Sequence, residues 1–171
     1  MKMFFYILLI IIANIVQISF LSHFDLLKNI NLILIIIILS TMTDYSLALS
    51  GSIIGGFLLD LYSSFWFGSS IIALFVMAVI VKNIFNSYFN KYHLFSYPVI
   101  GFIGILSYNL ILATVNNFFY WINLNKFIFI VNKFYWINLA EQIILNIILI
   151  ILFYLFAIWM HTKLQNFFIK L

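Results

Sequence analysis

The chain alternates between long hydrophobic runs and short polar segments. Residues 3–24, 61–81 and 142–162 contain no Asp, Glu, Lys or Arg. Each run is long enough for an α-helix to cross about 30 Å of hydrocarbon at about 1.5 Å per residue. The pattern therefore predicts an all-α integral membrane protein, a compact bundle of about six transmembrane helices in a single domain, residues 1–171. The predicted spans are residues 3–21, 31–43, 45–61, 68–85, 98–115 and 139–160.

Polar residues mark the turns between the predicted spans. Asp44 lies between the second and third spans with almost no loop around it, which indicates a tight helical hairpin. The alternative is one long tilted helix, but it would place the carboxylate of Asp44 near the middle of the bilayer, at a high cost unless paired. Pro98 suits the first turn of the fifth span, because that turn needs no backbone donor from it. Residues 116–138 mix Trp and Tyr with Asn and Lys, which predicts the longest loop, interfacial or re-entrant in character.

The composition argues against most enzymatic chemistry. The chain is 67% hydrophobic and only 7% charged, which leaves no room for a soluble catalytic domain. Cysteine is absent, so disulfides, thiolate metal sites and cysteine nucleophiles are excluded. His23, His93 and His161 lie near span ends without ligand spacing, and no phosphate-binding glycine motif occurs. We therefore expect no catalytic residue, no metal, no cofactor and no nucleic-acid partner, and we expect the protein not to be an enzyme.

The lysines predict the orientation of the bundle in its membrane. With six spans, both termini lie on the same side, and five lysines then share that side: Lys2, Lys82, Lys91, Lys163 and Lys170. Three lysines fall on the other side: Lys28, Lys126 and Lys133. Because cytoplasmic segments carry an excess of positive charge, this distribution predicts that both termini are cytoplasmic.

Small residues recur at helical spacing in the third span. Gly51 and Gly55 are four residues apart, and Ser52, Gly56 and Asp60 repeat the same spacing. Residues four apart share one face of a helix, so small side chains there allow a neighbouring helix to approach closely. The spacing predicts a tightly packed interface between helices.

Asp60 stands at the end of this small-residue face. A carboxylate there cannot point into lipid without a large cost. We expect it to accept hydrogen bonds from free backbone donors at the start of the fourth span, across the turn that contains Ser63 and Ser64. On this basis we expect Asp60→Asn to be tolerated and Asp60→Leu to lower the amount of folded protein. The alternative is that the charge of Asp60 pairs with a partner protein at the outer face.

The third span and the turn after it resemble a known family. The pattern small-x-x-x-Gly-x-x-x-Asp-Leu-x-Ser, with a Gly eight residues after the Asp, resembles the signature of the rod shape-determining protein MreD family. In this chain it is carried by Ser52, Gly56, Asp60, Leu61, Ser63 and Gly68. The close match covers residues 51–80, and elsewhere the similarity is one of length and hydropathy. Ser52 stands where the family often has Gly, and Ser64 stands where a turn Gly is common.

The resemblance implies a non-enzymatic role in the bacterial inner membrane. MreD proteins are similar in fold to the substrate-binding subunits of energy-coupling-factor transporters. They act with MreC, the actin-like MreB, RodA and penicillin-binding protein 2 to direct lateral peptidoglycan synthesis and to maintain rod shape. The interface implied for helix packing or for such partners comprises Gly51, Ser52, Gly55, Gly56, Asp60, Ser63 and Gly68.

A second hypothesis is a subunit that binds a small, vitamin-type molecule for a membrane transporter. A ligand pocket should bring polar and aromatic side chains together near one face. The candidates are Tyr108, Asn109, Trp136, Glu141, Gln142 and Asn146. The simpler interpretation is that each such residue hydrogen-bonds across the bundle, since Asn is abundant throughout the chain.

Overall fold

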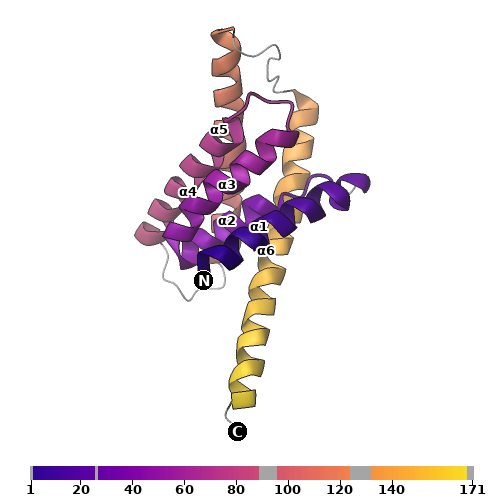
Figure 1. Ribbon diagram of the computed structural model, residues 1–171. Helices are drawn as coiled ribbons and strands as arrows, with labels where there is room; N and C mark the ends of the chain where they lie inside the picture. Colours follow the sequence, from indigo (N-terminus) through magenta and orange to yellow (C-terminus); the bar gives the residue numbers. More distant parts are fainter. Residues whose placement is uncertain (1, 26, 89–95, 124–131, 169–171) are drawn as a thin grey trace.

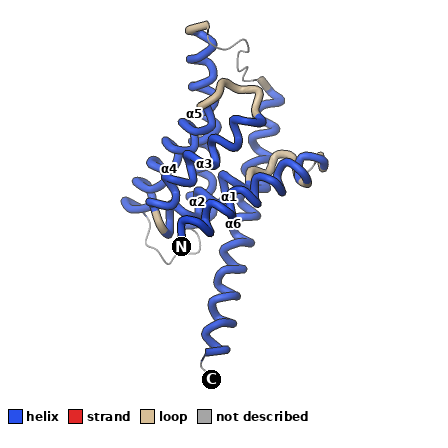
Figure 2. Tube along the Cα trace, in the orientation of Figure 1, coloured by secondary structure: helices blue, strands red, loops and turns tan. Residues whose placement is uncertain are grey.

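The computed structural model describes residues 2–25, 27–88, 96–123 and 132–168, and in these segments all regular structure is helical (Figure 2). The helices are α1 (Lys2–Ser19), α2 (Leu32–Thr43), α3 (Tyr45–Tyr62), α4 (Ser69–Tyr88), α5 (Ser96–Trp121) and α6 (Lys133–Phe168). A short 3-10 helix, η1 (Leu21–His23), follows α1. The predicted all-α bundle is confirmed, and each of the six predicted spans corresponds to one helix, of which α2 is shorter than a membrane span.

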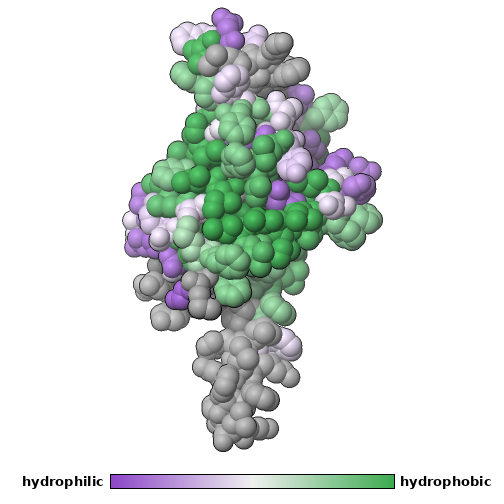
Figure 3. Space-filling model, viewed as in Figure 1, coloured by the Kyte–Doolittle hydropathy of each residue, from purple (hydrophilic) through white to green (hydrophobic). Residues whose placement is uncertain are grey.

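Five of the six helices are long and apolar enough to cross a membrane, namely all but α2. Their outward side chains are hydrophobic: Phe4 is 69% exposed, Leu110 53% and Ile144 59%. Hydrophobic side chains also cover the middle of the face seen in Figure 3, and polar ones gather toward its edges. An apolar surface of this kind suits lipid and not water. The chain is a multi-pass membrane protein.

Helix α2 forms the centre of the bundle. It has only 12 residues, a length of about 18 Å, which is short of the ~30 Å of a bilayer core. Five of its residues have no exposed surface: Ile33, Leu34, Ile35, Ile37 and Ile38. A helix that is covered over most of its surface belongs to the interior of a bundle. Only one side of α2, with Leu32, Ile36 and Leu39, is half-buried. Helices α1, α3, α4, α5 and α6 all pack against it.

Asp44 separates α2 from α3. Its backbone is extended, with φ −138° and ψ 102°, and its carboxylate accepts hydrogen bonds from the N–H groups of Ser46 (3.1 Å) and Leu47 (3.4 Å). An N-cap of this type starts a new helix. The predicted break at Asp44 is confirmed, and a single long helix through this residue is excluded. Pro98 lies in the first turn of α5, as predicted.

The predicted loop at residues 116–138 is wrong at both of its ends. Helix α5 continues to Trp121 and α6 already begins at Lys133, so much of the segment is helical. The aromatic residues that suit a membrane interface also continue the helices, and α5 reaches about 39 Å as a result. Residues 124–131, with Lys126, lie outside the described residues, as do Lys91 and Lys170.

Helix α6 is the longest element and extends beyond the rest of the bundle (Figure 1). Its 36 residues correspond to about 54 Å, and the part of it that qualifies as a membrane span is Lys133–Phe156. The start of α1 and the end of α6 lie toward the same end of the bundle (Figure 1). The side of the membrane on which they lie remains the prediction made from the lysines.

Candidate functional site

One small-residue face of α3 packs directly against α4. A Cβ atom on Gly56 would lie 2.5 Å from Cα of Ile71, which is closer than real contacts allow. One turn earlier, the hydroxyl of Ser52 donates hydrogen bonds to the carbonyl oxygens of Ala48 (2.8 Å) and of Leu74 in α4 (3.4 Å). Small side chains are therefore required for the two backbones to approach this closely. The predicted close approach is present at Gly56.

The second pair of glycines lies on a different face. A Cβ atom on Gly51 would meet the hydroxyl and ring of Tyr6 in α1, at 2.5–2.9 Å. A Cβ atom on Gly55 would lie 2.6 Å from Cγ2 of Ile33 in α2. Helix α3 thus turns one small-residue face to α4 and the other to α1 and α2. This explains why two overlapping four-residue repeats occur in the same helix.

Asp60 caps the start of α4. Its carboxylate is buried, with 5% of the residue exposed. Oδ2 accepts from the N–H groups of Gly68 (2.9 Å) and Ile71 (3.4 Å), and Oδ1 accepts from that of Ser70 (2.9 Å). These donors have no partner within their own helix, and the positive end of the helix dipole favours a negative charge there. The hydrogen bonds expected from the sequence are present.

The turn at residues 63–68 is fixed from both sides. The hydroxyl of Ser63 donates to the carbonyl oxygen of Asp60 (3.4 Å), and Gly68 has φ +98°, a conformation that favours glycine. From α5, Oδ1 of Asn116 accepts from the N–H of Trp66 and from the hydroxyl of Ser69, each at 3.3 Å. We call residues 60–70 with Asn116 the capped turn.

Asn116 was missed by the sequence analysis, which placed it at the start of a loop. It is 1% exposed and also donates from Nδ2 to the carbonyl oxygen of Leu112 (2.9 Å). A buried amide in an otherwise apolar helix must find partners, because an unpaired polar group costs about 1–3 kcal/mol. That rule predicts a partner for Asn116 but not which residue it is.

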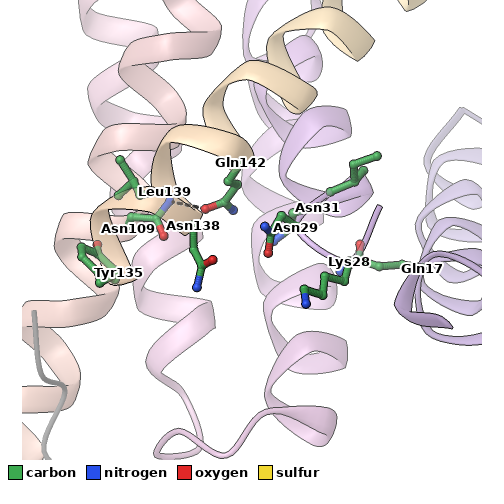
Figure 4. A pocket seen from close by; sticks show the side chains of 10 residues that line it. Gln17, Lys28, Asn29, Asn31, Asn109, Tyr135, Asn138, Leu139 and Gln142 are labelled. Atoms are coloured by element: carbon green, nitrogen blue, oxygen red, sulfur yellow. Dashed lines mark hydrogen bonds between the residues drawn. The ribbon is translucent and has the colours of Figure 1, made fainter. Parts of the chain in front are cut away.

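A polar cavity of about 220 Å³ lies between the segment before α2 and helices α1, α5 and α6 (Figure 4). We call it the amide cavity. In Figure 4, Asn109, Asn138 and Gln142 lie on one side, and Gln17, Lys28 and Asn29 lie on the other. Its lining residues are Gln17, Lys28, Asn29, Ile30, Asn31, Asn109, Tyr135, Asn138, Leu139 and Gln142.

Hydrogen bonds between distant parts of the chain hold the walls of the amide cavity. Nδ2 of Asn29 donates to Oε2 of Glu141 (2.8 Å), and Nδ2 of Asn109 donates to Oε1 of Gln142 (3.0 Å). The backbone N–H of Asn31 donates to Oδ1 of Asn146 (3.0 Å). The structure thus brings together four of the six residues considered for a ligand pocket. Each of these three hydrogen bonds joins a side chain of α6 to another part of the bundle.

The other two candidates lie elsewhere. Trp136 is 53% exposed and does not line the amide cavity. Tyr108 lines a second cavity of about 230 Å³, which shares Gln17 with the first. Asn14 also lines this second cavity, and its buried Oδ1 has no hydrogen-bond partner among the described residues.

Comparisons with family models, curated proteins and solved structures give no match to this chain. The capped turn and the amide cavity must therefore be interpreted from their own chemistry. Among the described residues, no group of three or more His, Cys, Asp or Glu side chains could hold a metal ion. Both sites are built from hydrogen-bonding groups in a hydrophobic bundle. Such groups are suited to binding a ligand or to holding a surface in position for a partner protein.

Proposed function

We propose that the protein is a non-enzymatic component of the bacterial cell-elongation machinery in the inner membrane. In this role it scaffolds lateral peptidoglycan synthesis and maintains rod shape, together with an MreC-like protein and, through the same assembly, MreB, RodA and penicillin-binding protein 2. The observation that carries the proposal is the capped turn. The residues that resemble the MreD signature, among them Gly56, Asp60 and Gly68, are those that pack α3 against α4 and shape this turn.

The capped turn presents a fixed surface at one end of the bundle. Tyr62 is 68% exposed and Phe67 is 54% exposed, while Asp60 beneath them is buried. The ring of Phe67 is held at 5.7 Å from that of Phe57 in an edge-to-face arrangement. Aromatic side chains held in one position are favourable anchors for a protein partner, because little conformational entropy is lost on binding. Under the lysine-based orientation this surface faces outward, and we assign it to the MreC-like partner.

The test combines capture of the partner with cell shape. The tagged chain is purified from native membranes, and the bound proteins are identified by mass spectrometry. We expect an MreC-like protein to be captured by the wild type and lost in Phe67→Ala, with unchanged amounts of the tagged chain. Phe4→Ala is the matched control, since Phe4 is 69% exposed on α1 and lies outside the capped turn. Cells depleted of the chain should become round.

Two results would contradict the proposal. If depleted cells keep their rod shape and the wild type captures no MreC-like protein, the chain has no role in elongation. If Phe67→Ala captures the partner as well as the wild type does, the capped turn is not the docking surface.

A substrate-binding subunit of a small-molecule transporter, of the vitamin-binding type, is the second candidate function. The observation that favours it is the amide cavity, where Asn109 bonds to Gln142, and Glu141 and Asn146 bond to the segment before α2. A transporter ATPase in place of the MreC-like protein in the same capture experiment would identify this assembly.

A further inference from the structure

The amide cavity contains more hydrogen-bonding groups than the fold uses. Six side-chain amides line it: Gln17, Asn29, Asn31, Asn109, Asn138 and Gln142. Polar side chains are costly inside a membrane bundle, so a cluster of this size calls for partners.

Part of the cluster has a structural role, and part does not. Oε1 of Gln17 accepts from the N–H of Leu32 (2.9 Å), and Oε1 of Gln142 accepts from Asn109. Within the described segments, Nε2 of Gln17 and Nε2 of Gln142 donate no hydrogen bond, and the side chain of Asn138 makes none. The side-chain NH₂ groups of Gln17, Gln142 and Asn138 can therefore donate hydrogen bonds to a ligand in the cavity. The side-chain oxygen of Asn138 can also accept one.

Among the described residues, the lining of the cavity carries one charged side chain, and that side chain is paired. Lys28, the one cationic side chain in the lining, forms an ion pair with Asp25 at 3.1 Å. Glu141 is not one of the lining residues, and its carboxylate accepts from the neutral amide of Asn29. A ligand with a net charge would therefore meet no unpaired counter-charge among the lining residues. The cavity is suited to a neutral molecule.

The chemistry of the lining defines the class of ligand. A side-chain amide offers both donors and an acceptor, and a hydroxyl group likewise donates and accepts, so several amides around one cavity match a molecule with several hydroxyls. The volume of about 220 Å³ is below the ~300 Å³ at which pockets for drug-sized ligands begin. We propose that the amide cavity binds a neutral, polyhydroxylated molecule of the size of a single sugar. This inference deepens the second candidate function and is also compatible with the elongation role, because it concerns a different surface from the capped turn.

The proposal is tested by calorimetric titration of the full-length protein in detergent micelles. The probes are glucose, N-acetylglucosamine and inositol as neutral molecules, and glucose 6-phosphate and glucosamine as charged ones. We expect saturable binding of at least one neutral probe with a Kd of about 1 mM or below, and no binding of the charged probes.

Two variants locate the binding site. Asn138→Leu should weaken binding by about 3–10-fold, the loss expected for one hydrogen bond, without affecting folding because Asn138 is exposed and makes no bond of its own in the described structure. Asn86→Leu, the same change at an exposed position of α4 away from the cavity, should leave binding unchanged.

The opposite results would overturn the proposal. If no neutral probe binds, the cavity holds only water. If binding is equal in Asn138→Leu and the wild type, the probe binds elsewhere. If only a charged probe binds and Lys28→Gln abolishes this binding, the ligand class is wrong. Because these measurements use the purified chain, a negative result is distinct from failure of the elongation role, which is tested by partner capture and cell shape.

Discussion

Replacing Asp60 tests whether the capped turn depends on this carboxylate. Both of its oxygens accept backbone hydrogen bonds, at 2.9 Å from Gly68 and at 2.9 Å from Ser70. Asp60→Asn keeps the shape but replaces one oxygen by an NH₂ group, which then faces a backbone N–H. Asp60→Leu removes both acceptors. From the sequence we expected Asp60→Asn to be tolerated. The structure instead predicts a loss of stability, because an Asn side chain retains only one of the two acceptors that the turn uses.

The magnitudes follow from the number of hydrogen bonds lost. A hydrogen bond to a charged group contributes about 1.5–3 kcal/mol, and loss of a helix N-cap costs about 0.5–2 kcal/mol. We expect Asp60→Asn to lower the free energy of unfolding by about 1–2 kcal/mol. Asp60→Leu leaves both close donors unpaired in a buried site and should cost about 3–6 kcal/mol. At about 2–4 °C per kcal/mol for a chain of this size, the melting temperature should fall by about 2–8 °C for Asn and by more than about 6 °C for Leu.

The assay is thermal unfolding of the purified protein in detergent, followed by tryptophan fluorescence. The chain has four tryptophans and no cysteine, so thiol-reactive dyes cannot be used. Trp66 lies in the capped turn, and its ring packs against that of Phe119 at 5.5 Å, so its emission reports on this region. Asp25→Asn and Asp25→Leu are the matched controls, because Asp25 is 97% exposed and pairs only with a surface lysine.

The order of the melting temperatures decides the result. We expect the wild type to have the highest melting temperature, Asp60→Asn a lower one and Asp60→Leu the lowest. Both Asp25 variants should melt at the temperature of the wild type. If Asp60→Leu unfolds at the temperature of the wild type, the carboxylate does not stabilise the turn. If both Asp60 variants are fully stable yet lose the partner protein, the charge itself takes part in recognition.

Three further predictions concern the rest of the bundle. Gly56→Ala should lower the melting temperature by more than Gly101→Ala does, because its Cβ would clash with the backbone of α4, whereas that of Gly101 would meet isoleucine side chains of α6 and clash only with the end of one of them. Equal shifts would contradict the close-packing argument. Asn116→Leu should cost about 1–3 kcal/mol in the same assay, since it removes the acceptor for two donors of the turn; an unchanged melting temperature would show that the turn needs no support from α5. Reporter fusions after Leu171 and at Lys126 should read cytoplasmic and external respectively, and an external C-terminus would refute the predicted orientation.

The helices could be predicted from the sequence because their length is set by the membrane. Uncharged runs of about 20 residues have few alternatives to a spanning helix, and the break at Asp44 follows from the cost of a charge within the bilayer. The ends of α5 and α6 were harder to locate. Aromatic residues near Trp121 and Trp136 suit an interfacial loop and a helix end equally well, and only packing decides between them.

The two sites differ in how far the sequence predicts them. The bonds of Asp60 were predictable, because the donors at the start of α4 lie 8–11 residues away along the chain. The amide cavity was only partly predictable. Asn31 and Asn146 are 115 residues apart, and an Asn in a membrane helix shows that a partner is needed without showing where it lies.

The short central helix has a consequence for how the chain is assembled during synthesis. Helix α2 is too short to enter the membrane as an independent span, so it must enter together with α3. Two of the N–H groups at its start are satisfied by side chains from elsewhere, that of Leu32 by Gln17 and that of Asn31 by Asn146. The second of these partners leaves the ribosome 115 residues after Asn31. The core of the bundle is therefore completed only when its last helix has been made, and a nascent chain that stalls before α6 exposes a polar helix end to the insertion and quality-control machinery.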